Sequence, residues 1–519
     1  MSTTHREARN TAVGLTAIVA VTGALRFFAT DGWPHPDEQM VLGGLANFEV
    51  VRVSSPVVAY GGGYFHPLGA WMNLWREFLG PESLQNWHST ERGNMLLVAR
   101  QWSALLSTIT PALTFVVGRR VFGPTAGLLA ALFVAAAPLA TKEAQIAKAD
   151  SAAAFVAAVA LVALTHEWTH AVRRALALGL VGGVLVSTKY LVGFGPAVLF
   201  GLLSDPDGFA WPRSLRNVAI AVAAAVSTFL LLNPHFVTAP SPSWFFLDSV
   251  RRSQFTWPQQ DGLSGFVAAP WIYHPAVSLW AGCGAGFTLL AAPALAWGFL
   301  GSGARRVVAI AVLGHCIVLL ANPLTAARNF LPALPGLAAL VGGVIVAAAS
   351  RLSRSDATMA LLAATFALVI TARPLSDSMR YVRLLSKADT RAVAAKWIEE
   401  NVEPGVPIRG WGTPAGLVQR GLPRLRGRQI TRAPRTPAKW RRMRPGILVH
   451  HRYPLAFSRV PLPAVGHDLL RLAAFSPAAD ELDDAVFADY ASYLPISGFG
   501  SLERPGPWIE IYATRGHGR

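Results

Sequence analysis

Two adjacent carboxylates follow the first long apolar stretch of the chain, in the segment His35-Pro36-Asp37-Glu38. Pro36 disfavours a continuing helix, so we expect the segment to leave the apolar stretch and lie at a membrane surface. Arg26 is the nearest basic residue in the sequence. A carboxylate held beside a hydroxyl group can act as a general base. A hydrated interfacial loop without chemistry is the alternative.

A second charged segment, residues 141–150, lies between two apolar stretches and carries Lys142, Glu143, Lys148 and Asp150. Asp150 opens the next apolar stretch, where a carboxylate suits the positive end of a helix dipole, and this capping role would suffice to explain it. Charges so close to a bilayer nevertheless require water or a polar cavity. If both acidic segments lie on the same side of the membrane, their carboxylates are predicted to converge.

Several cations are predicted on that same side. Lys189 stands between two apolar stretches without an acidic neighbour in sequence. An ammonium group suits phosphate oxygens, although a lysine that snorkels to the interface is the alternative. His66, Arg251 and Arg328 are further candidates for an anionic ligand, and the Arg251-Arg252 pair is unusual for an outward loop.

The composition indicates the surroundings in which this chemistry would take place. Of 519 residues, 52% are hydrophobic and only 14% are charged, whereas soluble domains carry roughly 25% charged residues. Disorder and coiled coils are excluded, a soluble enzyme is disfavoured, and a multi-pass membrane protein is expected. The net charge of +17 is interpreted as membrane topology and anionic lipid rather than nucleic acid. Two cysteines in apolar stretches predict neither a disulfide nor a metal site.

Eleven apolar stretches predict membrane-spanning helices, at 11–29, 95–118, 125–141, 151–168, 175–188, 190–204, 217–233, 276–300, 307–321, 329–350 and 357–373. Every second loop carries arginines, for example Arg119-Arg120 and Arg305-Arg306. This positive-inside pattern predicts a protein of the inner (plasma) membrane with a cytoplasmic N-terminus. The first outward loop would be 30–94, and the C-terminus would be extracytoplasmic.

The composition changes after residue 373, where long apolar stretches end. Residues 389–403 have helical spacing with an N-cap at Asp389 or Thr390, and the segments 447–449 and 508–512 read as strands. We therefore predict a transmembrane domain at 1–373 and a small soluble α/β domain at 374–519. The basic segment from Arg420 to Arg444 is either a solvated loop or a surface for anionic lipid headgroups or a polyanionic acceptor.

Several segments, in this order, resemble the GT-C membrane glycosyltransferases, in particular the group of protein O-mannosyltransferases and aminoarabinose transferases (glycosyltransferase family 39-like). The matching segments are 35–38, 65–71, 143–155, 182–190 and 328–335, together with 389–402 and 506–512 in the tail. Two departures stand out: His66 replaces a lysine of the aminoarabinose branch and precedes one proline rather than two. That branch has thirteen spans, so the resemblance implies an α-helical fold with about 11–13 transmembrane helices.

The resemblance implies an inverting transfer of a sugar from a polyprenyl-phosphate donor to an acceptor hydroxyl on the outer face of the membrane. Asp37 would be the general base, and Glu38 would orient Asp37 or the sugar. Glu143 and Asp150 would line the same cavity. The donor phosphate, as leaving group, would be held by His66, Lys189 and Arg328, with Arg251 as a further candidate.

The expected partners are the donor lipid, an acceptor that is a lipid, glycan or protein, and the bilayer, with no nucleic acid. The sequence assigns no metal ligands, and it leaves open whether a divalent cation takes part. A secondary transporter or lipid flippase is the alternative, but internal repeats and midplane charges are lacking. A phosphotransferase that moves a lipid headgroup would need a nucleophile or a metal cluster that the sequence does not display.

Overall fold

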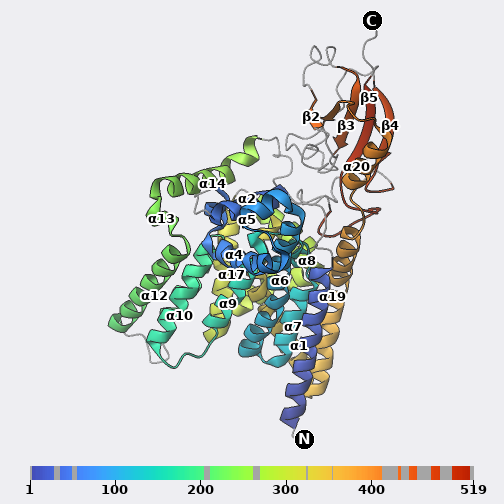
Figure 1. Cartoon of the computed structure of the whole chain (residues 1–519). Helices are drawn as coiled ribbons and strands as arrows, with labels where there is room; N and C mark the ends of the chain where they lie inside the picture. The colour runs from blue at the N-terminus through green and yellow to red at the C-terminus, as the bar shows by residue number, and fades with distance from the viewer. Residues whose placement is uncertain are drawn as a thin grey trace. The chain divides into compact units, whose positions relative to one another are not determined.

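The computed structural model describes residues 3–28, 36–49, 55–203, 211–260, 269–322, 325–353, 355–411, 430–433, 444–452, 469–479 and 494–514. The chain divides into two compact units, Met1–Met379 and Arg380–Arg519 (Figure 1). The sequence placed the domain boundary after residue 373. The division between the two units falls a few residues later in the chain, inside the long helix α19 (Asp356–Leu385).

The first unit is built from helices. In chain order they are α1 (Thr3–Phe27), α2 (Pro36–Glu49), α3 (Ser55–Tyr60), α4 (Gly62–Leu79), α5 (Leu84–Thr90), α6 (Arg92–Phe122), α7 (Pro124–Ala136), α8 (Pro138–Ala144), α9 (Ala149–Leu164), α10 (Ala171–Ser187), η1 (Val192–Phe194), α11 (Gly195–Leu203), α12 (Trp211–Leu232), α13 (His235–Thr238), α14 (Pro240–Gln260), α15 (Pro270–Tyr273), η3 (His274–Ala281), α16 (Ala285–Phe299), α17 (Gly303–Ala321), η4 (Ala327–Ala333), α18 (Leu334–Leu352) and α19.

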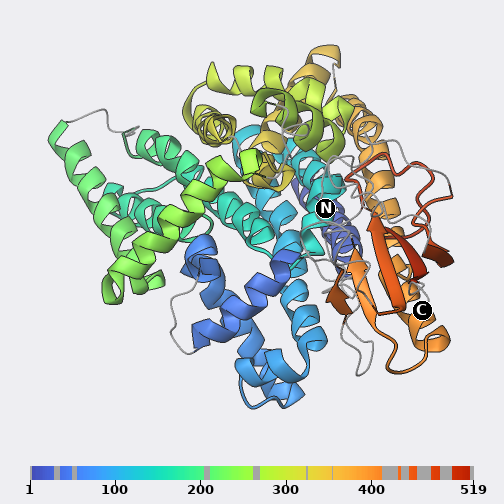
Figure 2. The ribbon, with the colours of Figure 1, turned by 90° about the horizontal axis from the view of Figure 1, so that it is seen from above.

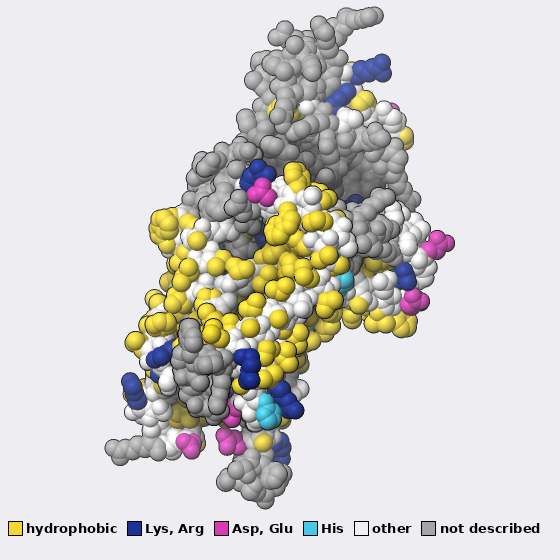
Figure 3. All heavy atoms as spheres, turned by 90° about the vertical axis from the view of Figure 1, so that its left-hand side faces the viewer, with side chains coloured by type: hydrophobic (Ala, Val, Ile, Leu, Met, Phe, Trp, Pro, Cys, Tyr) yellow, Lys and Arg dark blue, Asp and Glu magenta, His cyan; other side chains and the backbone are white. Residues whose placement is uncertain are grey.

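Long apolar helices identify a multi-pass membrane protein. Within the described residues, six helices are long and apolar enough to cross a bilayer, or seven if the bent pair α7–α8 is one span. Three shorter apolar segments, at α9, η1–α11 and α16, add to these. Each of the eleven predicted stretches falls on a helix, or on consecutive helices, of this unit. Figure 3 shows apolar side chains over much of one face of the molecule, as expected for contact with lipid.

The span formed by α7 and α8 is broken, with a bend of 58° between the two helices. Pro138 begins α8 and has no N–H with which to bond the carbonyl of Val134. Arg26 of α1 donates instead to the carbonyl oxygens of Val134 and Ala135, at 3.3 and 3.1 Å. A side chain thereby satisfies the carbonyls that the break would leave unpaired inside the membrane. The break turns the chain into the segment that carries Lys142 to Asp150.

The predicted first outward loop contains helices rather than irregular chain. The helices α2 to α5 lie here, and Tyr64, Phe65 and Trp87 form a fully buried core with residues of α6. Pro36 begins α2, and the two acidic residues occupy its first turn. As the sequence predicted, the first helix does not continue through Pro36: α1 ends at Phe27, and a separate helix begins at Pro36. Proline in the first turn followed by acidic residues is a helix start, because both suit the unbonded N–H groups there.

The second unit contains a five-stranded sheet, whose strands are drawn in orange and red in Figure 2. The strand order is β2-β1-β3-β5-β4. The strand bounds are β1 (Ile408–Trp411), β2 (Ile430–Arg432), β3 (Gly446–Arg452), β4 (Leu469–Phe475) and β5 (Trp508–Thr514). The strands β1, β2 and β3 are parallel, whereas β5 pairs antiparallel with both β3 and β4. The predicted strands at 447–449 and 508–512 are confirmed, and with them the expected small C-terminal sheet.

One helix covers a face of this sheet. It is α20 (Thr390–Asn401), and its residues Ala394 and Ile398 pack against Ile408, Val449 and other sheet residues in a buried core. Asp389 caps the helix by accepting a hydrogen bond from the N–H of Arg391 at 2.8 Å. The predicted helix and its N-cap are confirmed, since helical spacing and a capping side chain give local signals.

Candidate active site

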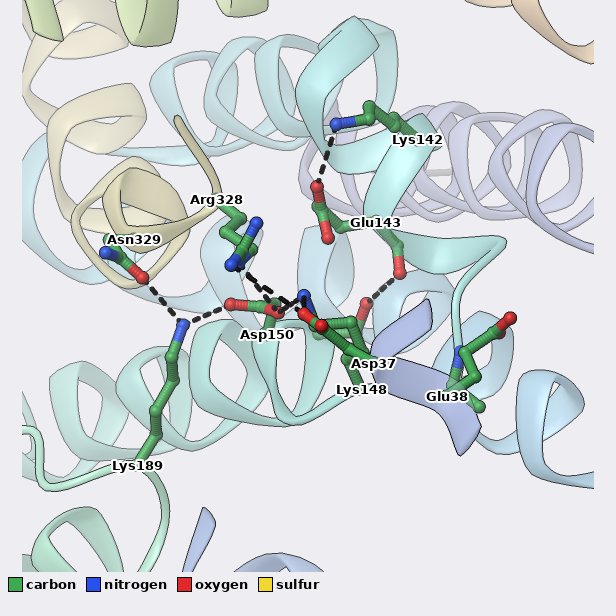
Figure 4. A network of polar contacts seen from close by, with 11 residues as sticks. Asp37, Glu38, Lys142, Glu143, Lys148, Asp150, Lys189, Arg328 and Asn329 are labelled. Carbon is green, nitrogen blue, oxygen red and sulfur yellow. Dashed lines mark hydrogen bonds and ion pairs between the residues drawn. The ribbon is translucent and has the colours of Figure 1, made fainter. Parts of the chain in front are cut away.

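A lysine lies between the carboxylates of the two acidic segments. Lys148, in the loop between α8 and α9, places its Nζ 2.7 Å from Oδ2 of Asp37 and 3.8 Å from Oδ2 of Asp150 (Figure 4). Burial and Arg328 lower the pKa of Lys148, whereas Asp37 and Asp150 raise it, and the net shift is upward. The lysine is therefore cationic at neutral pH, and it joins the start of α2 to the start of α9.

Two further cations complete this cluster. Lys189, in the turn after α10, contacts Oδ1 of Asp150 through its Nζ and donates a hydrogen bond to Oδ1 of Asn329 at 2.9 Å. Arg328, on η4, lies 3.8 Å from Asp37 and 3.9 Å from Asp150. Figure 4 shows these side chains pointing toward one another from four separate parts of the chain. Lys189 has no acidic neighbour in sequence, and its acidic partner Asp150 comes from a distant part of the chain.

Three side chains of the cluster are partly exposed, and two are buried. The side chains of Asp37, Arg328 and Lys189 are 30, 24 and 20% exposed, whereas those of Lys148 and Asp150 are 2 and 1% exposed. Among these described residues, three cations face two carboxylates, so the cluster has a formal excess of one positive charge. A molecule that enters would meet a carboxylate beside two cations, which suits an acceptor hydroxyl next to an anionic group.

Glu38 has an environment quite different from that of Asp37. Its carboxylate accepts two hydrogen bonds from Arg100 of α6, both at 2.7 Å, and a third from the N–H of Ala147 at 2.7 Å. Both side chains of this ion pair are buried. Glu38 thus fixes the backbone next to Lys148, and its contact with Ala147 ties α2 to the loop that leads into α9.

A second buried ion pair joins neighbours in sequence. Lys142 and Glu143 lie at the end of α8 with Nζ and Oε1 3.4 Å apart, and both are almost fully buried. The backbone carbonyl of Glu143 accepts a hydrogen bond from Ser151 at 3.2 Å, which connects this pair to the start of α9. Glu143 lies close to the cluster in Figure 4, although no ion pair joins it to Lys148 or Arg328 among the described contacts.

The turn that presents Lys189 is held in an unusual backbone conformation. Lys189 and Tyr190 have φ angles of 62° and 51°, in the left-handed region that side chains other than glycine seldom adopt. The N–H of Lys189 donates to the carbonyl of Tyr60 at 3.2 Å, and the hydroxyl of Tyr190 donates to the carbonyl of Val58. Gly63 lies so close to Ser187 and Thr188 that a Cβ there would clash. These contacts fix the lysine against the first loop.

The remaining predicted site residues lie outside the cluster or outside the described residues. The ring Nε2 of His66 lies 3.0 Å from the carbonyl oxygen of Leu232, at the end of α12. Next to that end, Asn233 accepts a hydrogen bond from the N–H of Gly62 at 2.8 Å. His35 lies outside the described residues, as does the side chain of Arg251.

The sequence analysis did not single out Lys148, Arg100 or Asn329, although all three contact predicted site residues. Lys148 was noticed only as one charge of a short loop. Its position two residues before Asp150 was a usable signal. Lys148 precedes α9 directly and Asp150 lies in the first turn of that helix, so the two charges are held near each other. Arg100 carried the stronger signal: a charge within a long apolar helix requires a buried partner.

Comparisons with known proteins bear on the family and the fold of the chain. The family model described as dolichyl-phosphate-mannose-protein mannosyltransferase matches residues 90–237, which include Lys148, Asp150 and Lys189. The crystal structure of ArnT from Cupriavidus metallidurans bound to undecaprenyl phosphate is similar, with a TM-score of 0.52 at 15% identity, covering 84% of this chain and 92% of that chain. No curated protein sequence matches the chain.

A second solved structure, the apo oligosaccharyltransferase of Archaeoglobus fulgidus, has a TM-score of 0.49 at 11% identity and covers 76% of this chain and 58% of that chain. The likeness to ArnT extends over nearly the whole of both chains. The chain therefore has the GT-C fold, and the resemblance predicted from its sequence is confirmed.

Proposed function

We propose, on the premise of the GT-C fold, that this protein transfers a sugar from a polyprenyl-phosphate donor to a hydroxyl acceptor. The observation that carries the proposal is the cluster around Asp37 and Asp150, which has more cations than carboxylates and is open beside Asp37. Similarity to a structure that holds undecaprenyl phosphate supports a lipid phosphate as the anionic part of the donor.

In the proposed reaction, Asp37 is the general base. As the acceptor oxygen attacks the anomeric carbon, its proton passes to the carboxylate of Asp37, which is the exposed one of the two. The bond from the anomeric carbon to the phosphate oxygen breaks, and its electron pair leaves with the polyprenyl phosphate. Attack opposite the leaving group inverts the anomeric configuration. The transfer thus needs a base near the acceptor hydroxyl and cations near the leaving phosphate.

Arg328 and Lys189 are the proposed partners of the donor phosphate. The side chains of both are partly exposed, and cations placed there stabilise the negative charge that develops on the leaving phosphate.

His66 and Arg251 are retained as further contacts of the phosphate or of the lipid entrance. Glu143 and Asp150 line the inner wall, where Asp150 orients Lys189 and Lys148.

The arrangement of arginine-bearing loops supports a cytoplasmic N-terminus, so the reaction would take place on the extracytoplasmic face of the inner membrane. Asp37 lies just after α1, and Lys189 follows α10 at the end distant from Arg173 and Arg174. The second unit would then be extracytoplasmic as well. Acceptors on that side include lipids, glycans and secreted proteins, and the cluster itself does not distinguish among them.

The test is a transfer assay with purified protein in liposomes. A panel of polyprenyl-phosphate sugars is supplied together with envelope lipids, glycans and proteins as acceptors, and the release of free polyprenyl phosphate is followed by mass spectrometry. Asp37→Asn keeps the size of the side chain and removes the proton acceptor, so we expect turnover to fall by about 10²-fold or more. Analysis of the product anomer by NMR tests inversion.

Two outcomes would contradict the proposal. If no donor releases polyprenyl phosphate while the protein moves the intact lipid across the bilayer, the protein is a transporter. If Asp37→Asn is expressed normally and transfers at nearly the wild-type rate, the base lies elsewhere, and Asp150 is the next candidate. Lys396→Met, a change on the exposed face of α20, controls for effects of purification and reconstitution.

A further inference from the structure

The place between the two site carboxylates is taken by an ammonium group. Nζ of Lys148 lies 2.7 Å from Asp37 and 3.8 Å from Asp150, and the lysine is buried. A divalent cation shared by these carboxylates would need their oxygens at about 2.0–2.6 Å. The metal would therefore lie at the position of the ammonium group and would have to displace it.

The surrounding residues also disfavour a metal. Lys189 and Arg328 already face Asp150 and leave the cluster with a formal excess of one positive charge. A divalent cation in place of the Lys148 ammonium group would raise that excess to two while adding no carboxylate. Among the described residues, no group of three or more His, Cys, Asp or Glu side chains is arranged to hold a metal ion. The residues at this site do not fit a divalent cation.

We infer that Lys148 takes the place of a divalent metal, so that this site transfers its sugar without one. The inference rests on the proposed function for its catalytic part. Lys148 acts as a positioning residue, because its ammonium group holds Asp37 beside the entrance and fixes the start of α2 against the start of α9. It neutralises the paired carboxylates, which is what a bridging metal would do, but it is attached covalently to the loop.

The loop around Lys148 is built to keep the ammonium group in this place. The N–H of Ala147 is bonded to the buried carboxylate of Glu38 at 2.7 Å. Two residues earlier, the side chain of Gln145 donates to the carbonyl oxygens of Leu25 and Arg26, at 2.9 and 2.8 Å. The segment that leads into Lys148 is thus anchored both to α2 and to α1. A lysine on a fixed backbone needs no free cation to hold the carboxylates together.

The first experiment measures metal binding and does not depend on activity. Mn²⁺ is titrated into the purified full-length wild type and Asp37→Asn proteins, and free Mn²⁺ is followed by electron paramagnetic resonance. We expect the same number of bound ions in both proteins, because Asp37 is paired with Lys148. A Mn²⁺ ion bound by the wild type and lost in Asp37→Asn would overturn the inference, whatever the protein transfers.

Lys148→Asp provides a positive control for that titration. It removes the ammonium group and supplies a third carboxylate, a ligand set that suits Mn²⁺, so it should gain a bound ion that the wild type lacks. If this variant does not fold, the comparison of wild type with Asp37→Asn still decides the question. The gain should disappear in the double variant Lys148→Asp/Asp37→Asn.

The second experiment uses the transfer assay. Wild-type turnover should be unchanged by EDTA, and full inactivation by EDTA with recovery in Mn²⁺ would contradict the inference. Lys148→Met should lower kcat by about 10²-fold with little change in the KM for the donor, because a misplaced base slows the chemical step. Lys148→Arg, which keeps the charge, should recover part of kcat. The matched change Lys396→Met, at an exposed lysine, should have no effect.

Discussion

Asp37 and Glu38 are neighbours in the first turn of α2, but their surroundings differ in almost every respect. Glu38 is fully buried and accepts hydrogen bonds from Arg100 and from the backbone at Ala147. Asp37 is 30% exposed and contacts Lys148 on its inner side. The carboxylate of Glu38 is surrounded by hydrogen-bond donors, whereas the carboxylate of Asp37 remains partly accessible to solvent.

The comparison shows how one short motif can serve two purposes. A carboxylate that accepts three short hydrogen bonds in a buried place has its acceptor capacity largely used, so it fixes structure. A carboxylate with an exposed face can still accept a proton from a molecule that enters. Adjacent acidic residues therefore need not form a catalytic pair. In this protein the buried residue positions the loop that carries the cationic partner of the exposed one.

The largest effect should follow from breaking the buried pair. Arg100→Met leaves the carboxylate of Glu38 buried without its ionic partner, and we expect a loss of about 3–5 kcal/mol in the free energy of unfolding. Equilibrium unfolding in mixed micelles measures this loss. The double variant Glu38→Gln/Arg100→Met, which removes both charges, should regain part of it. Equal stability of wild type and Arg100→Met would show that this carboxylate is not held as the geometry indicates.

A smaller effect is expected at a partly exposed cation of the cluster. Lys189→Met keeps the apolar stem and deletes the charge, which removes the excess positive charge of the cluster. Loss of a charge-assisted contact with the donor phosphate should weaken donor binding by roughly 1.5–3 kcal/mol, or about 10- to 150-fold. Titration of donor lipid into purified protein measures the dissociation constant.

Lys189→Arg is the matched control, since it keeps the charge and should retain most of the affinity. An unchanged dissociation constant in Lys189→Met would mean that the lysine serves only as the partner of Asp150. The donor phosphate would then have to be sought at Arg328 and at Arg251-Arg252.

The smallest effect concerns a carboxylate in the second unit. Asp389 caps α20 and pairs with Arg391 at 2.7 Å, and both side chains are largely buried. The double variant Asp389→Ala/Arg391→Met removes both partners of the buried pair, so that mainly the loss of the cap remains, and it should lower the free energy of unfolding of this unit by roughly 0.5–2 kcal/mol. Thermal unfolding followed by circular dichroism, in the full-length protein, measures the change. Turnover at a permissive temperature should stay at the wild-type value, and a specific loss of kcat would contradict the assignment.

The sequence predicted what depends on local pattern. Apolar stretches gave the helices, helical spacing with a capping residue gave α20, and the charges at Asp37, Asp150, Lys189 and Arg328 were expected on one side of the membrane. The structure brings these four side chains together. Charged groups at a membrane surface are informative because they are costly without partners.

The partners themselves were harder to predict, since each comes from a distant part of the chain. Arg26, the nearest cation in sequence to Asp37, bonds instead to carbonyl groups at the break between α7 and α8. Arg100 and Lys148 supply the ion pairs of the acidic motif. Contacts of this kind depend on how helices pack, which the spacing of residues along one segment does not encode.

The contacts of η4 have a consequence for the order in which the site is completed during synthesis. Asp37 leaves the ribosome long before Lys148, and Asp150 is synthesised well before Lys189 and Arg328. Until η4 has been made, both carboxylates lack Arg328 as a cationic partner. Lys148 and Lys189 alone balance Asp37 and Asp150, so the excess of positive charge in the cluster appears only when η4 has been synthesised.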